Sequence, residues 1–204
     1  MKKIIAITII ISVVIFLVSC QGISNKIRAV GYNGSARGKE QTGDYKGAIA
    51  DYDSAIKLYP EYTVAISNRG HAKFNLGEFK ESIVDYNKAV EISPQEAGIY
   101  SNRGLAYYKM GDTIKALDDY NKAIILDSNF DYAFSNRGEV EFDQRKYKLA
   151  IKDLDRAIAI NKYNATAYIN RAYCERKMGD TIKAEKDFAE ARKCSSRKDS
   201  ATIK

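Results

Sequence analysis

Asn68-Arg69-Gly70 returns as Asn102-Arg103-Gly104, as Asn136-Arg137-Gly138 and, in altered form, as Asn170-Arg171-Ala172. The spacing between these triplets is 34 residues each time. A strict period of this length is typical of a chain that stacks one small structural unit on the next, because each unit buries its apolar face against its neighbours. The triplet therefore predicts an all-α solenoid, with an elongated core in place of a single globular one.

Small and large residues follow the same period. Positions 8, 20 and 27 of each 34-residue copy are small, which lets two helices approach closely, and large residues at positions 4 and 24 fill the space between them. Position 27 is Ala55, Ala89, Ala123, Ala157 and Ala191; position 4 is Tyr32, Ile66, Tyr100, Phe134 and Tyr168. Within each copy the apolar residues recur every three or four positions, which favours helices.

This pattern resembles the tetratricopeptide repeat, and the resemblance implies five helix–turn–helix copies. They cover residues 29–62, 63–96, 97–130, 131–164 and 165–198, followed by a polar tail at residues 199–204. In four copies a glycine stands where the first helix must end and turn, a place that favours positive φ. These glycines are Gly43, Gly77, Gly111 and Gly179. Arg145 takes this place in the fourth copy, so we expect a strained or differently shaped turn there.

Residues 1–19 have the features of a secretory signal peptide. Lys2 and Lys3 precede an apolar run at residues 4–18, whose helical length of roughly 22 Å is less than the roughly 30 Å hydrocarbon core of a bilayer. Leu17-Val18-Ser19-Cys20 then resembles the bacterial lipobox. The resemblance implies cleavage after residue 19, attachment of lipid such as palmitate to Cys20, and a short linker at residues 20–28. An uncleaved amino-terminal anchor is the alternative.

The net charge of +7 is concentrated at the two ends of the chain. Lys26, Arg28, Arg37 and Lys39 lie near the amino terminus, a second basic group lies beyond residue 191, and residues 44–191 sum to −2. A nucleic-acid-binding protein would usually carry a basic stripe along its fold, so we expect no nucleic-acid partner. The amino-terminal excess either faces anionic lipid headgroups or is solvated.

Position 6 of the last four copies is always asparagine: Asn68, Asn102, Asn136 and Asn170. In the tetratricopeptide family the first helices line the concave face, so the resemblance implies that these amides form a ladder there. An amide offers a donor and an acceptor, which matches a peptide backbone of any sequence. The ladder is therefore a candidate peptide-binding site; the alternative is that asparagine is only tolerated on a polar helix surface.

Arginine at position 7 and aspartate at position 23 occur together in the same four copies. The arginines are Arg69, Arg103, Arg137 and Arg171, and the aspartates are Asp85, Asp119, Asp153 and Asp187. The first copy has Ser35 and Asp51 at these positions. We interpret the two columns as structural ion pairs between packed helices. A row of arginines that faces an anionic ligand is the alternative.

The remaining candidates are weaker. Positions 9 and 12 vary from copy to copy, which suits specific recognition but also follows from drift: His71, Leu105, Glu139 and Tyr173, then Phe74, Tyr108, Phe142 and Arg176. The sequence has no nucleophile motif, phosphate-binding glycine loop or metal-ligand spacing, so we expect no enzyme, cofactor or metal. Cys174 and Cys194 are expected to be two buried thiols, since their positions on the helix pair are too far apart for a disulfide.

Together these patterns predict a protein–protein interaction module, tethered by lipid to the cell membrane or outer membrane of a bacterium. Its partner would be a protein that offers a peptide or a helix to the concave face. A scaffold or adaptor in an envelope assembly is the first hypothesis, by resemblance in architecture to repeat lipoproteins of outer-membrane or pilus assembly. An accessory subunit that presents a soluble ligand or a partner enzyme is the alternative.

Overall fold

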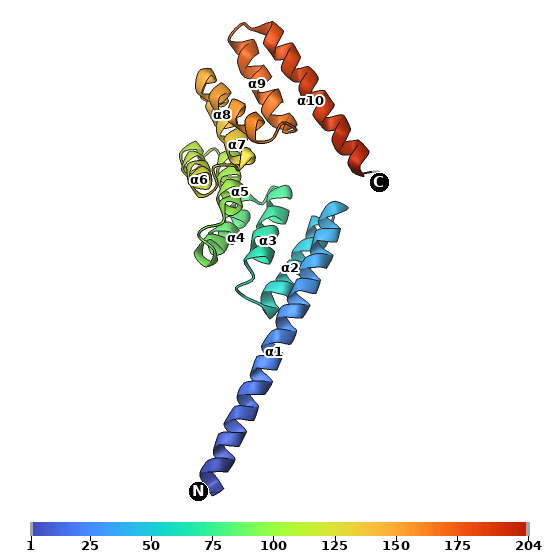
Figure 1. Cartoon of the computed structure of the whole chain (residues 1–204), viewed down its shortest axis with the longest axis vertical. Helices are drawn as coiled ribbons and strands as arrows, with labels where there is room; N and C mark the ends of the chain where they lie inside the picture. The colour runs from blue at the N-terminus through green and yellow to red at the C-terminus, as the bar shows by residue number, and fades with distance from the viewer. Residues whose placement is uncertain (1, 203–204) are drawn as a thin grey trace. The chain divides into compact units, whose positions relative to one another are not determined.

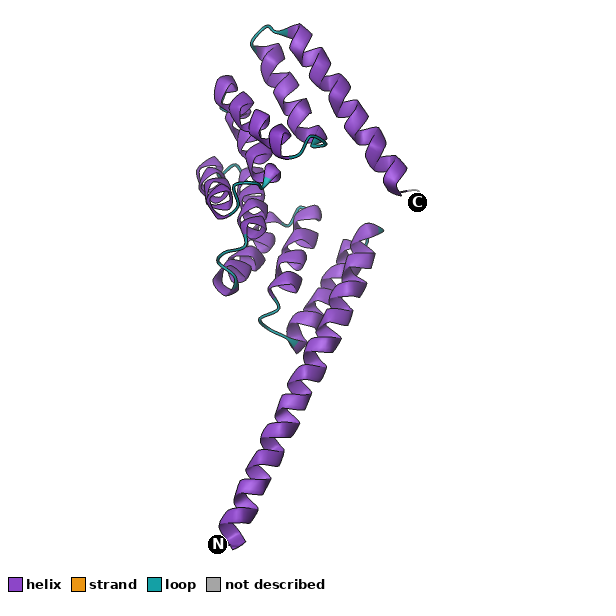
Figure 2. Ribbon diagram, in the orientation of Figure 1, coloured by secondary structure: helices purple, strands orange, loops and turns teal. Residues whose placement is uncertain are grey.

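The computed structural model describes the backbone of residues 2–202 and the side chains of residues 21–195, and in this part of the chain every regular element is a helix (Figures 1 and 2). The chain divides into two compact units, Met1–Ile92 and Ser93–Lys204. Unit 1 holds α1 (Lys2–Gln41), α2 (Tyr45–Leu58), α3 (Thr63–Asn75) and α4 (Phe79–Ile92). Unit 2 holds α5 (Ala97–Lys109), α6 (Thr113–Leu126), α7 (Asp131–Asp143), α8 (Tyr147–Ile160), α9 (Ala165–Lys177) and α10 (Thr181–Thr202). The predicted all-α tandem-repeat fold is confirmed.

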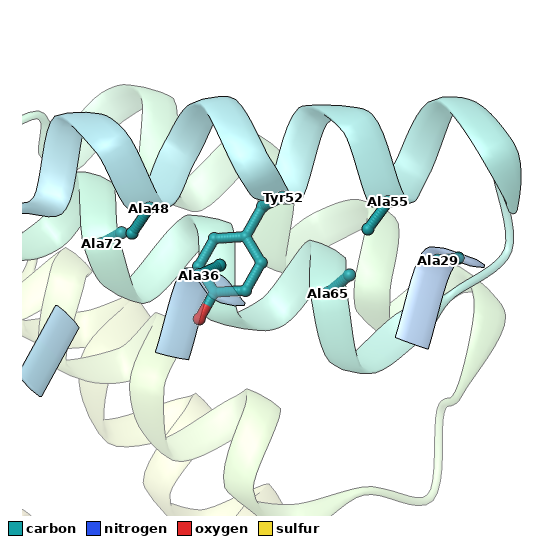
Figure 3. Packing of buried hydrophobic residues seen from close by; sticks show 7 residues of the cluster. All are labelled: Ala29, Ala36, Ala48, Tyr52, Ala55, Ala65 and Ala72. Carbon is teal, nitrogen blue, oxygen red and sulfur yellow. The ribbon is translucent and has the colours of Figure 1, made fainter. Parts of the chain in front are cut away.

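The core of unit 1 is built from alanines around one tyrosine. Ala36, Ala48 and Ala55 are fully buried, and they bring α1 and α2 close enough for the Tyr52 ring to fill the space between them (Figure 3). Tyr52 is also fully buried, and its hydroxyl donates to Glu40 Oε2 at 2.8 Å. This pairing satisfies the polar end of a large buried ring.

Unit 2 repeats this packing around a glycine. A Cβ placed on Gly104 would lie 2.9 Å from Tyr120 Cε1 and 3.2 Å from the Ala116 carbonyl oxygen. Because real Cβ contacts are longer than this, a side chain at Gly104 would push α5 away from α6. The small residue at position 8 is thus required by the distance between the two helices.

The turn inside each helix pair follows the glycine pattern. Gly43, Gly77, Gly111 and Gly179 have φ between 80° and 88°. Arg145 occupies the same left-handed region with φ 59°, at a cost of roughly 1–2 kcal/mol for a residue that has a Cβ. The expected strain at the fourth turn is therefore present.

Both ends of the chain differ from the simplest interpretation of the repeat. Residues 21–28, taken from the sequence as a link, are helical and continue α1 without a break, through Gly31 and Gly34. At the other end α10 continues to Thr202, past the last repeat boundary at residue 198. Among the residues that the structure describes, no helix is long and apolar enough to span a membrane. The side chain of Cys20 lies outside the described residues.

Candidate functional site

In unit 1 the position-7 arginine joins three helices. Arg69, on α3, donates from Nε and Nη2 to the two carboxylate oxygens of Asp85 on α4, at 3.0 and 2.5 Å. Its Nη1 donates to Asp53 Oδ1 on α2 at 2.5 Å. Since Asp85 is almost fully buried, the arginine satisfies a carboxylate that water cannot reach, and it also links one repeat to the previous one.

Unit 2 contains the same two-pronged pair three times. Arg103, Arg137 and Arg171 each use Nε and Nη2 on one aspartate, at 2.5–2.8 Å: Asp119, Asp153 and Asp187 respectively. Each guanidinium also lies over the position-4 ring of its own helix, 5.4–5.7 Å from the centroid. The hydrogen bonds to Asp187 raise the pKa of Arg171, so its positive charge is maintained.

The sequence analysis missed the third partner of these arginines. Arg137 Nη1 donates to Asn121 Oδ1 and Arg171 Nη1 donates to Asp155 Oδ1, both at 2.6 Å and both on the preceding second helix. These acceptors belong to a column at position 25: Asp53, Asn87, Asn121 and Asp155. The period of 34 would have revealed this column of short polar acceptors. We call an arginine with its position-23 and position-25 partners an arginine clamp.

The asparagines lie on the first helices and are all half-buried. Asn68 Nδ2 donates to Asn33 Oδ1 at 3.3 Å in unit 1, and Asn136 Nδ2 donates to Ser101 Oγ at 3.4 Å in unit 2. Both bonds run to the first helix of the previous repeat. Asn170 Nδ2 is buried with no hydrogen-bond partner. Part of the amide capacity thus serves helix packing, and the Asn170 amide nitrogen is enclosed within the fold. An amide has two donor hydrogens and an acceptor oxygen, so Asn68 and Asn136 use only one donor each in these bonds.

Around the asparagines, the first helices of unit 2 carry exposed aromatic rings. Tyr132 on α7 is 56% exposed and Tyr173 on α9 is 46% exposed. The Tyr173 ring lies 6.4 Å from Phe142 and 5.3 Å from Phe188, so two further rings support it. Burial raises the pKa of Glu139, on the same helix as Tyr132. We call this surface of α5, α7 and α9 the first-helix face of unit 2.

The two described cysteines are free thiols, but only one of them is buried. Burial raises the pKa of the Cys174 thiol to about 11, which suppresses the reactive thiolate. Cys194 is partly exposed, and its Sγ lies 3.6 Å from the Lys162 carbonyl oxygen. The expectation of two buried thiols is therefore wrong for Cys194, because α10 forms the end of the described chain and no further helix covers it. No cluster of metal-ligating side chains occurs among the described residues.

Comparisons with known proteins agree with this geometry. Models of the tetratricopeptide repeat match residues 32–62, 97–130 and 135–198, and a TPR repeat model matches residues 70–111. No curated protein is similar enough to count as a relative.

Among solved structures, MamA is 23% identical with a TM-score of 0.65, covering 81% of this chain and 96% of MamA. Pseudomonas aeruginosa PilF is 17% identical with a TM-score of 0.76, covering 84% and 78%. YrrB, described as a TPR protein with an unusual peptide-binding site, is 19% identical with a TM-score of 0.59, covering 84% and 88%. At these identities the likeness shows the fold alone. The family models and the helix pairs together show that this chain belongs to the tetratricopeptide-repeat proteins.

Proposed function

We propose that this chain is a membrane-tethered interaction module that holds a peptide or helix of another protein against the first-helix face of unit 2. Tetratricopeptide-repeat proteins bind protein or peptide partners, and the family is shown here by four matching models. The arginine clamps use their guanidinium groups within the fold, which leaves the asparagines and the exposed tyrosines as the groups for recognition. The module would act as a scaffold or adaptor in a bacterial envelope.

The single observation that carries the proposal is the pair of exposed rings beside the amides. Tyr132 and Tyr173 present large, rigid surfaces, which are enriched at protein interfaces. Asn136 follows Tyr132 by four residues on α7, so the two side chains lie on the same side of that helix. An amide beside an aromatic ring can bind a peptide backbone and an apolar side chain at the same time. YrrB, a protein of similar fold, is itself described as having a peptide-binding site.

A photo-crosslinking amino acid tests the surface directly. Placed at Tyr132 in cells, it should give a discrete crosslinked product, and placed at the comparably exposed Ile125 of α6 it should give none. Tyr173→Ala should weaken the crosslink from residue 132 strongly and lower the melting temperature only slightly, because the ring is half exposed and loses only its contacts with Phe142 and Phe188. Identical products from both positions, or none from residue 132, would reject this face as the binding surface.

The tether is tested separately at Cys20. We expect Cys20→Ser to abolish labelling by a radioactive fatty acid and to release the protein from the membrane or leave it unprocessed. Continued labelling of the Cys20→Ser protein would show that the lipid is attached elsewhere or that the leader is an uncleaved anchor. The crosslinking result does not depend on this outcome.

A further inference from the structure

The turn between α7 and α8 differs in chemistry from the turns inside the other four helix pairs. In those turns the glycine is followed by an acidic residue: Asp44, Glu78, Asp112 and Asp180. The fourth copy has Arg145 and Lys146 instead, and Lys148 follows. Residues 145–152 contain four cations and no anion. This turn is therefore a local basic patch in a repeat region whose net charge is slightly negative.

The basic residues make the turn less stable than its counterparts. Arg145 adopts a left-handed φ that glycine adopts freely. Lys146 stands at the N-cap of α8 without a side-chain cap, whereas Asp44 and Asp112 accept backbone hydrogen bonds at the same place in α2 and α6. Folding thus does not explain these two residues. Strain of this kind suggests a functional role when a site lies beside it.

A hollow of about 440 Å³ lies beside this turn. Its walls are Arg145, Lys146, Tyr147, Lys148, Leu149 and Met178. Leu149 is 52% exposed and Met178 is 48% exposed, and the three cations are exposed as well. At the place of Leu149 the other copies have Gly47, Glu81, Lys115 and Lys183. The combination of exposed apolar side chains and a basic rim therefore occurs at the turn between α7 and α8, where copies four and five meet, and the other copies lack the apolar residue at the place of Leu149.

The positive charge of the rim is not neutralised by neighbours. Within the described part of the chain, Arg145, Lys146 and Lys148 take part in no ion pair. The charge of Lys146 acts on Glu141, but burial outweighs it and raises the pKa of that carboxyl. Asp180 of the next turn is held by Lys183 at 2.7 Å.

We propose that this hollow, the α7–α8 pocket, docks an acidic segment of a partner protein that carries one large apolar residue. The apolar side chain would enter between Leu149 and Met178, and flanking carboxylates would meet Arg145 and Lys146. An arginine fork binds a carboxylate through two parallel hydrogen bonds, and the low exposure of an inserted side chain strengthens the contact.

Two other occupants fit less well. A bilayer surface is met by apolar residues that protrude, whereas Leu149 and Met178 line a shallow hollow here. A second copy of this chain would have to offer its own acidic turns, where exposed Ile114 and Ile182 follow Asp112 and Asp180. Those carboxylates already bind Lys115 and Lys183 and cap their helices.

The decisive variant restores the residues of the other turns. Arg145→Gly with Lys146→Asp removes both cations. Glycine adopts the positive φ without strain and aspartate caps α8, so the melting temperature should rise. The same variant should lose at least tenfold in affinity for the probe. Because binding falls while stability rises, unfolding cannot account for the loss. Leu149→Lys, which copies three and five carry naturally, should also weaken binding.

The probe is the peptide Asp-Glu-Ser-Phe-Glu-Asp, measured by microscale thermophoresis on the full chain in a nonionic detergent. Lys122→Asp with Lys186→Gln removes the same net charge from α6 and α10, and it should bind the probe like the wild type. The peptide Asp-Glu-Ser-Gly-Glu-Asp should bind much more weakly, since it lacks the single apolar residue.

Three results would overturn the proposal that the α7–α8 pocket docks an acidic segment. These are unchanged binding by the Arg145→Gly, Lys146→Asp protein, an equal loss in the α6 and α10 control, or equal binding of both peptides. Binding of mixed micelles that contain phosphatidylglycerol is measured in parallel, to test whether the site binds lipid instead. If they distinguish the wild type from the restored turn and the peptide does not, the site binds lipid and the proposal is wrong. If the restored turn lowers the melting temperature, Leu149→Lys decides the question.

Discussion

The position-23 aspartates have position-11 neighbours of opposite charge in the two units. In unit 1, position 11 is lysine: Lys39 lies 2.7 Å from Asp51, and Lys73 lies 2.7 Å from Asp85. In α7 and α9 of unit 2, position 11 is glutamate, and Asp153 and Asp187 repel Glu141 and Glu175 respectively. Oε2 of each glutamate is buried without a hydrogen-bond partner.

This difference shows how much each arginine clamp depends on one residue. Asp85 in unit 1 has two cations, Arg69 and Lys73. Asp187 in unit 2 has Arg171 as its cation and Glu175 as a repelling neighbour. The cation is therefore duplicated at Asp85 in unit 1, while in the last copy of unit 2 the aspartate relies on a single guanidinium.

Removing the arginine should have the largest effect, and an unequal one. Arg171→Ala leaves the carboxylate of Asp187, which is 5% exposed, without a cation, so we expect a loss of about 3–5 kcal/mol in the free energy of unfolding. Arg69→Ala leaves Lys73 in place, and the loss should be roughly half as large. Urea unfolding followed by circular dichroism measures both. Equal losses would show that Lys73 does not support Asp85.

Exchanging the position-11 charges should have an intermediate effect of opposite sign in the two units. Glu175→Lys supplies Asp187 with the partner that Lys73 gives Asp85, and should stabilise the protein by about 1–2 kcal/mol. Lys73→Glu brings the repulsion into unit 1 and should lower its stability. Glu175→Gln is the control, since it removes the repulsion without adding a cation. A Lys variant no more stable than the Gln variant would show that α9 lacks the geometry of α3.

The repeat period was sufficient to predict the fold and the pairs within a copy. A spacing of 16 residues between Arg103 and Asp119 recurs in each of the last four copies, and two packed antiparallel helices bring such positions together. The third partner needed knowledge of which earlier helix faces the arginine. Asn121 and Asp155 are short polar residues among many others, so their role follows only from the packing of one repeat on the next.

The ends of the repeat array could not be predicted in the same way. A repeat inside the array packs against one copy before it and one after it, but in the described part of the chain no copy precedes α1 or follows α10. Thus α10 extends beyond the repeat frame, and Cys194 is partly exposed although the pattern of a packed helix suggested burial. The identity of a ligand is not encoded in packing positions. Tyr173 stands among the variable positions of the repeat, whereas Tyr132 is found only from its exposure.

The smallest predicted effect is a difference in pH dependence between the units. Burial and the neighbouring aspartates raise the pKa of Glu141 and Glu175. In the window between the ordinary glutamate pKa and the raised one, the folded state binds more protons than the unfolded state. Stability from these groups is therefore fully present below the ordinary pKa, and it is lost as the pH rises through the raised pKa. Asp51 has the opposite sign, because hydrogen bonds from Lys39 and Ser35 lower its pKa.

Thermal unfolding of the wild type and of Glu175→Gln at a series of pH values isolates this contribution. At neutral pH the Gln variant should be the more stable protein, and its advantage should shrink as the pH falls toward the ordinary glutamate range, where Glu175 is protonated in both states. Asp51, Asp112 and Asp180 are shared by the two proteins, so their losses at lower pH cancel in the difference. If the Gln variant keeps the same stability advantage at every pH in this range, the Glu175 carboxyl is either already neutral at pH 7 or solvated by water. The contrast between the units would then be one of shape and not of charge.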